Sequence, residues 1–154
     1  MKGIVKFAVV YDPSMRHVYT AEQGKGMFLN GERQQVGVVD ARSPKVLLVI
    51  SREWNPPALF DRFVRALTEF NIYRFPLSDG ISYAYVASGK FDGVIALTKD
   101  TFPDFAGSLF IKEAGGIFTN KVGEVNIKPT DRVFVASHPS IHAKLLHIAR
   151  TVLS

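Results

Sequence analysis

The sequence predicts an α/β (α+β) fold in which an antiparallel β-meander precedes a mixed, mostly parallel sheet covered by helices. Two observations support this prediction. Residues 1–40 contain short β-rich segments separated by hairpin turn sequences such as Asn30-Gly31. Residues 45–154 alternate apolar strands with segments of helical periodicity, which is typical of a parallel or mixed sheet with helices on both faces. We therefore expect a single domain over residues 1–154, made of the meander and an αβα layer.

The meander is expected to contain antiparallel strands joined by short turns. Asp12-Pro13-Ser14 has the composition of one turn, and Gly24-Lys25-Gly26 has that of another. Because the glycine pair joins two strands, whereas a phosphate-binding loop opens a helix, we interpret it as a hairpin turn. The strands are expected at residues 3–11, 16–22, 27–29 and 34–36.

The helix-containing part of the chain follows a polar link. Lys45 to Ile50 is a continuous apolar run, which predicts a buried parallel strand. Asn55-Pro56-Pro57 has the composition of a helix start, and apolar residues at helical spacing follow it as far as Phe70. Ser78 is expected to cap a second helix that ends at Gly89. Further strands are expected at residues 72–75, 91–97, 117–119 and 132–136, and further helices from about 102 to the glycine pair 115–116 and at 140–152.

Composition limits the classes of function. The chain has 154 residues, of which 47% are hydrophobic, enough for one globular domain with a sizeable core. Its formal charge is +5, but the basic residues are scattered, so nucleic-acid binding is not expected. The absence of cysteine excludes disulfides, thiolate metal sites and cysteine nucleophiles. The sequence has no signal-peptide pattern and no apolar run of about 18 residues, so we expect a cytoplasmic protein without membrane contact.

Residues 102–116 carry the most informative motif. They place one carboxylate, Asp104, in the first turn of a predicted helix, follow it with small residues and end in Glu-Ala-Gly-Gly. This stretch resembles the second signature of the inositol monophosphatase family, Trp-Asp-x-Ala-x-Gly leading into Glu-Ala-Gly-Gly. Two meander segments, Val-Val-Tyr-Asp-Pro and Tyr-Thr-Ala-Glu-x-Gly-x-Gly-x-Phe-x-Asn-Gly, resemble the mid-chain strands of that family. The chain thus resembles the C-terminal half of the inositol monophosphatase/fructose-1,6-bisphosphatase-like (extragenic suppressor) family.

The resemblance implies the fold of that family's second half but not its full catalytic apparatus. Family members hydrolyse phosphomonoesters with Mg²⁺ ions held by several carboxylates. The Gly-Glu-Glu cluster and the Asp-Pro-x-Asp-Gly-Thr loop of the family's first half do not occur in this sequence. Only Asp104 corresponds to a family metal ligand, and this match requires a one-residue deletion, since an ungapped alignment places Pro103 there. Alternatively, Thr101 and Asp104 have the spacing of a helix capping box.

The positions that bind substrate in the family are altered in this chain. Where the family has Gly-Ser/Thr-Ala-Ala, this sequence has Leu77-Ser78-Asp79-Gly80. Ser78 and Asp79 are therefore candidate substrate-binding residues. Ala96 stands where relatives have an acidic residue. Lys99 is a further candidate because it follows a predicted strand, and α/β sheets bind ligands at the carboxyl ends of their strands.

Three functional interpretations remain. The first is a truncated inositol monophosphatase-like protein without independent phosphatase activity or cofactor, acting as a structural or binding subunit. The second is one subunit of a split Mg²⁺-dependent sugar or inositol phosphate phosphatase, in which Asp104 is a metal ligand and another chain supplies the missing carboxylates. The third is a basic ligand- or nucleic-acid-binding module, for which the sequence has no aromatic–basic signature. We favour the first, and whether the chain is an enzyme stays open.

The first strand predicts association with another chain. Phe7 and Val9 alternate with Ala8 and Val10, so both faces of this strand are apolar. The resemblance implies that first-half helices cover one of these faces in the complete fold. We expect a homo-oligomer formed through the meander, or a chain carrying the N-terminal half bound to the same surface. A small phosphorylated ligand is a further candidate partner.

Overall fold

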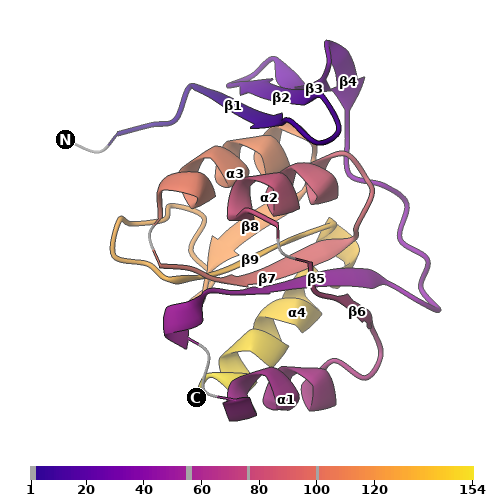
Figure 1. The fold of residues 1–154 in the computed structure, drawn as a ribbon, viewed down its shortest axis with the longest axis vertical. Helices are drawn as coiled ribbons and strands as arrows, with labels where there is room; N and C mark the ends of the chain where they lie inside the picture. The colour runs from indigo at the N-terminus through magenta and orange to yellow at the C-terminus, as the bar shows by residue number, and fades with distance from the viewer. Residues whose placement is uncertain (1–2, 55–56, 76, 100) are drawn as a thin grey trace.

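The computed structural model describes residues 3–54, 57–75, 77–99 and 101–154. In chain order the elements are β1 (Phe7–Asp12), β2 (His17–Glu22), β3 (Gly26–Leu29), β4 (Glu32–Gln34), β5 (Lys45–Ile50), a short 3-10 helix η1 (Arg52–Trp54), α1 (Pro57–Ala66), β6 (Asn71–Tyr73), α2 (Asp79–Ala87), β7 (Gly93–Leu97), α3 (Phe102–Glu113), β8 (Ile117–Asn120), β9 (Val133–Ser137) and α4 (Pro139–Val152). These elements stack in layers. Helices α2 and α3 lie between two sheets, and α1 and α4 cover the far face of the second sheet (Figure 1).

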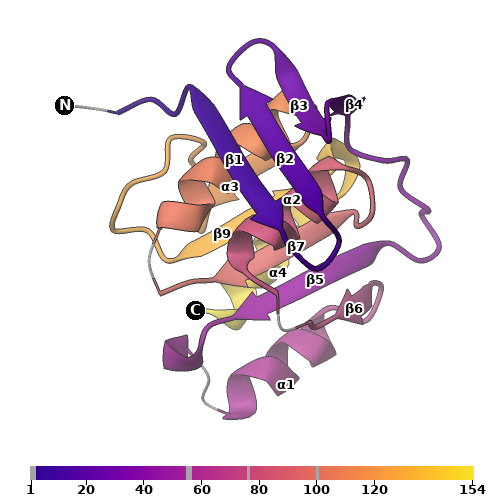
Figure 2. The same ribbon diagram turned by 45° about the horizontal axis from the view of Figure 1, so that its top comes forward.

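Strands β1 to β4 form the predicted antiparallel meander, here called sheet A. Val10 pairs with Tyr19, and each strand aligns with the next one along the chain. The turn between β3 and β4 has positive φ at both Asn30 (48°) and Gly31 (82°), a conformation that favours Asn-Gly. Sheet A lies across α2 and α3 (Figure 2), so one of its faces is buried against these helices.

The second sheet, sheet B, has the strand order β6-β5-β7-β9-β8. β5 pairs in parallel with both β6 and β7, whereas β9 is antiparallel to β7 and to β8. Only β9 runs against the other strands, which confirms the mixed, mostly parallel sheet. The chain passes from β5 through α1 to β6, and then through α2 back across β5 to β7. The order therefore reverses at β5, with α1 and α2 on opposite faces (Figure 1).

Sheet B separates two hydrophobic clusters. Val94 and Ala96 of β7 belong to the cluster around α2, α3 and sheet A, whereas Ile95 and Leu97 belong to the cluster around α1 and α4. This alternation explains why the strand is apolar at every position. Between α2 and α3 the packing is close, because a Cβ at Gly107 would overlap the ring of Tyr83. The small residues of the 102–116 motif thus allow these two helices to approach each other.

β4 and α1 are among the elements that end earlier than the sequence predicts. β4 stops before Val36, because the N–H of Val36 donates to the carbonyl of Ala114 at the end of α3 (2.9 Å). α1 ends at Ala66, and the periodic apolar residues beyond it, Leu67 and Phe70, are buried from a turn. The other predicted elements are present with ends shifted by up to four residues.

Two further sequence predictions concern the start of α1 and the lack of a membrane-spanning segment. Asn55 and Pro56, predicted to begin α1, lie outside the described residues. In the part of the chain that the structure describes, no helix combines the length and the apolar character needed to cross a bilayer.

Candidate functional site

The predicted site residues gather at one edge of sheet B. β5, β6 and β7 are parallel, so their carboxyl ends lie together, and α2 and α3 begin at the same edge. Ser78 and Asp79 stand at the start of α2, Lys99 follows β7, and Asp104 lies in the first turn of α3. Because the strand order reverses at β5, this edge is also where α/β sheets commonly bind ligands.

Asp104 is fully buried at the contact between α2 and α3. Its Oδ1 accepts a hydrogen bond from the hydroxyl of Tyr83, which is also fully buried. Burial first, and the charge of Asp104 second, raise the pKa of Tyr83 well above its ordinary value, so the phenol keeps its proton. A buried carboxylate is costly unless it accepts hydrogen bonds, and Tyr83 supplies one. Asp104 therefore contributes to helix packing.

The capping-box prediction for Thr101 and Asp104 is wrong. Thr101 is the N-cap residue of α3, but its side chain makes no capping hydrogen bond. Its hydroxyl instead donates to the carbonyl of Pro129 (3.1 Å). The hydroxyl thus fastens the loop before β9 to the start of α3, while the carboxylate of Asp104 faces Tyr83.

Ser78 and Asp79 occupy the first turn of α2. The Oγ of Ser78 accepts a hydrogen bond from the N–H of Ile81 (3.3 Å), which confirms the predicted cap. Asp79 is half-buried, and its negative charge, like that of Asp104, contributes to the raised pKa of Tyr83. Among the described residues, no group of three or more histidine, cysteine or acidic side chains is placed to hold a metal ion. Asp79 and Asp104 thus both raise the pKa of Tyr83, but the described residues place no such metal-binding group around them.

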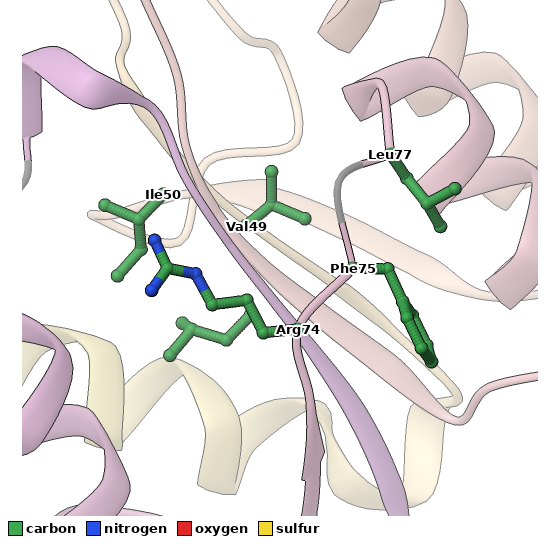
Figure 3. A pocket seen from close by; sticks show the side chains of 6 residues that line it. Val49, Ile50, Arg74, Phe75 and Leu77 are labelled. Atoms are coloured by element: carbon green, nitrogen blue, oxygen red, sulfur yellow. The ribbon is translucent and has the colours of Figure 1, made fainter.

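A pocket of about 410 Å³ lies beside the start of α2. It is lined by Leu48, Val49, Ile50, Arg74, Phe75 and Leu77. Figure 3 shows Arg74 reaching past the end of β5 toward Ile50, with Phe75 and Leu77 on the other side of that strand. The guanidinium of Arg74 lies over the ring of Phe60, 4.9 Å from its centroid. Sequence reasoning missed Arg74 and Phe75, although their position directly after β6 could have indicated them.

Lys99 lies apart from Asp104, in a second pocket. Its Nζ forms an exposed ion pair with Oε1 of Glu53 (3.3 Å). Both residues line a pocket of about 340 Å³ together with Trp54, Thr98 and Arg132. Of the sequence candidates, Ser78, Asp79 and Asp104 thus lie at the start of α2 and α3, whereas Lys99 lines a separate pocket at the same edge of sheet B.

A contact that sequence reasoning missed joins the two motifs that resemble the family. The carboxylate of Glu113, from Glu-Ala-Gly-Gly, accepts hydrogen bonds from the backbone N–H groups of Gly24 (2.9 Å) and Gly26 (3.0 Å). These glycines form the hairpin turn between β2 and β3, and both have positive φ. The end of α3 thus holds sheet A in place through one side chain.

Comparison with known proteins agrees with this architecture. The model of the inositol monophosphatase family matches residues 1–154. Nus factor SuhB of Salmonella typhimurium is 29% identical over 157 residues, which cover 100% of this chain and 58% of that protein. An inositol-1-monophosphatase of Rhizobium meliloti is 34% identical over 125 residues, which cover 79% of this chain and 47% of that protein.

Solved structures show the same partial match. The IMPase of Thermotoga maritima superimposes with a TM-score of 0.84 at 27% identity, covering 98% of this chain and 58% of that one. The extragenic suppressor protein suhB of Bartonella henselae gives a TM-score of 0.84 at 27% identity, covering 96% of this chain and 57% of that one. The chain spans little more than half the length of these relatives. It belongs to the inositol monophosphatase family and corresponds to the C-terminal half of that fold.

Proposed function

We propose that this chain is a catalytically silent member of the family that acts as a structural or binding subunit. The observation that carries this proposal is the burial of Asp104 against the hydroxyl of Tyr83. Metal-assisted hydrolysis of a phosphomonoester requires Mg²⁺ held by several oxygen ligands beside an open coordination position. Among the described residues, Asp79 and Asp104 are the carboxylates whose charges act on Tyr83, and two carboxylates are too few for such a cluster.

The helix packing supports the same proposal. To present the fully buried Asp104 to a metal ion, the α2–α3 contact around its carboxylate, where Tyr83 packs, would have to open. Gly107 sits against the ring of Tyr83, and that ring also packs on Phe118, with a centroid distance of 5.1 Å. Moving the ring would open a gap in the core, which is destabilising. The site favours a fixed packing role for Asp104.

The outer face of sheet A, turned away from α2 and α3, is the surface that we assign to binding. Its apolar side chains are exposed: Phe7 59%, Val9 52%, Tyr11 55% and Val18 39%. Phe7, Val9 and Tyr11 alternate along β1 and so lie on one face, and Val18 of β2 lies opposite Tyr11, so the four side chains form one patch. Exposed apolar patches of this kind mark protein–protein contacts. We assign the patch to a second copy of this chain, because two-fold assembly buries the same patch twice.

A split phosphatase is the second candidate function. It is supported by family membership together with the match to only 58% of the curated relatives. In this alternative another chain would supply the missing carboxylates, and Asp104 would leave Tyr83 to bind Mg²⁺.

Phosphatase assays distinguish the two functions. The purified chain with Mg²⁺ and inositol monophosphate or fructose bisphosphate should release phosphate no faster than a heat-inactivated control. Asp131→Asn removes an acidic residue whose carboxylate accepts from Asn120 and from the N–H of Lys128, with no hydrogen bond to Tyr83, and is the control for Asp104→Asn. Mg²⁺-dependent turnover that persists in Asp131→Asn and is lost in Asp104→Asn would overturn the silent assignment.

A further inference from the structure

The pocket that contains Lys99 lies between the carboxyl ends of β5 and β7. Glu53 and Trp54 follow β5, Thr98 and Lys99 follow β7, and Arg132 precedes β9. The pocket therefore lies at the reversal of strand order, where ligands of α/β sheets bind. Its volume of about 340 Å³ is within the range of small-molecule sites.

Backbone hydrogen bonds hold two of the lining side chains in place. The indole Nε1 of Trp54 donates to the carbonyl of Thr98 (2.9 Å), which fixes the ring across the two strand ends. The Nη1 of Arg132 donates to the carbonyls of Pro129 (2.7 Å) and Asp131 (2.7 Å). A guanidinium has five N–H donors. None of the described residues accepts a hydrogen bond from Nε or Nη2 of Arg132. Arg132 is thus a cation held in one orientation, with N–H donors available to a ligand. Such preorganisation favours the binding of an anion.

The second cation of the pocket, Lys99, is held only loosely. Lys99 pairs with Glu53 at 3.3 Å, and both side chains are largely exposed, so this ion pair contributes little stability. An incoming anion can take the place of the Glu53 carboxylate at low cost. Among the described lining residues, Lys99 and Arg132 outnumber Glu53, so these side chains carry a net positive charge.

A buried hydroxyl in the pocket wall is unsatisfied. Thr98 lines the pocket and is fully buried, and its Oγ1 has no hydrogen-bond partner among the residues that the structure describes. Buried hydroxyls are normally hydrogen-bonded, so this hydroxyl is an exception that a bound group would explain.

We propose that this pocket binds a small organic anion. Its phosphate or carboxylate group lies between Lys99 and Arg132, and its flat ring packs against Trp54. The pocket shares no lining residue with the Tyr83–Asp104 contact. Binding in this pocket does not depend on whether the chain is catalytically silent.

The fluorescence of Trp54 tests the proposal directly, because it is the single tryptophan of the chain. Phenyl phosphate and benzoate present the same ring with a phosphate or a carboxylate, so they show which anion is preferred. Inorganic phosphate tests the contribution of the charge without the ring, and phenol tests that of the ring without the charge. We expect a saturable change in emission with at least one of the two ring-bearing anions, a weaker response to inorganic phosphate, and none to phenol.

Two exposed variants move the affinity in opposite directions. Lys99→Met should weaken binding by about tenfold, the value of one charge-assisted hydrogen bond. Glu53→Gln should tighten binding, because it removes the carboxylate that competes for Lys99. Lys112→Met, an exposed lysine at the other end of α3, should bind as the wild type does. Absence of a saturable signal, equal affinity in Lys99→Met, or weaker binding in Glu53→Gln would overturn the proposal.

Discussion

Tyr83 and Asp104 are 21 residues apart in the chain and meet across the α2–α3 interface, where the tyrosine hydroxyl donates to the buried carboxylate. The residue that the sequence offers as a metal ligand is therefore part of the core. This contact links the fold to the proposed loss of catalysis, because the same packing that stabilises α3 occupies the carboxylate.

Replacing Tyr83 by phenylalanine should reveal the contribution of this hydroxyl. Tyr83→Phe should lower the free energy of unfolding by about 1–3 kcal/mol, because the buried carboxylate loses a donor that water cannot replace. Urea unfolding followed by circular dichroism measures the loss. Tyr85→Phe is the matched control, since its hydroxyl lies on the same helix but makes a longer bond (3.4 Å) to Asp12 in a half-buried position. Equal losses in the two variants would show that the Tyr83 hydroxyl has no special role.

Glu113 should be needed for the docking of sheet A. Glu113→Ala removes the acceptor for two backbone N–H groups, those of Gly24 and Gly26, and should cost about 1–2 kcal/mol of unfolding free energy. Lys112→Ala, an exposed neighbour in the same turn, should change stability little. Hydrogen exchange adds a local readout, because the amides of Gly24 and Gly26 should lose protection first. Unchanged protection of these amides in Glu113→Ala would contradict the role assigned to the carboxylate.

Sequence reasoning succeeded where the determining chemistry is local. Asn30-Gly31 requires a turn with positive φ, and Ser78 caps the helix that follows it, so both features were predictable from neighbouring residues. The end of α1 at Ala66 was not predictable. Apolar residues at helical spacing indicate which side chains are buried, and Phe70 is buried although it lies beyond the helix.

The candidate site depends on contacts between distant segments. Thr101 and Asp104 have capping-box spacing, yet their side chains bond to Pro129 and Tyr83, which the local sequence cannot show. Glu113 and Gly24 are 89 residues apart, so each motif was recognisable while their contact was not.

The pH dependence of stability should report on His142. This ring is buried between the Oγ of Ser137 (Nδ1, 3.1 Å) and the Oγ1 of Thr119 (Nε2, 3.0 Å), and burial lowers its pKa. As the pH falls below about 6.5, the unfolded state binds a proton before the folded state does. The contribution of the neutral ring is therefore fully present above that pH and decreases below it.

Urea unfolding between about pH 7 and pH 5.5 tests this expectation. The unfolding free energy of the wild type should decrease across the window, and His142→Gln should flatten the slope. His147→Gln alters an exposed residue of the same helix and should leave the slope as in the wild type. An equal slope in His142→Gln would exclude His142 as the source.

The outer face of sheet A should mediate assembly. Light scattering of the wild type should show a dimer, and Phe7→Glu should shift it to monomer, because the charge would be buried in the contact. Val38→Glu changes a side chain that is 98% exposed and lies outside both sheets, so it should remain dimeric. A wild type that is monomeric, with Phe7→Glu equally well folded, would show that this face does not bind a second copy.

The central claim is that Asp104 serves helix packing and does not bind metal, and the melting temperature measured against Mg²⁺ concentration tests it most directly. A ligand that binds only the folded state raises the melting temperature in a saturable way. At constant ionic strength, Mg²⁺ should leave the melting temperatures of the wild type, Asp131→Asn and Asp104→Asn unchanged. A saturable rise in the wild type and in Asp131→Asn that is absent in Asp104→Asn would contradict the account.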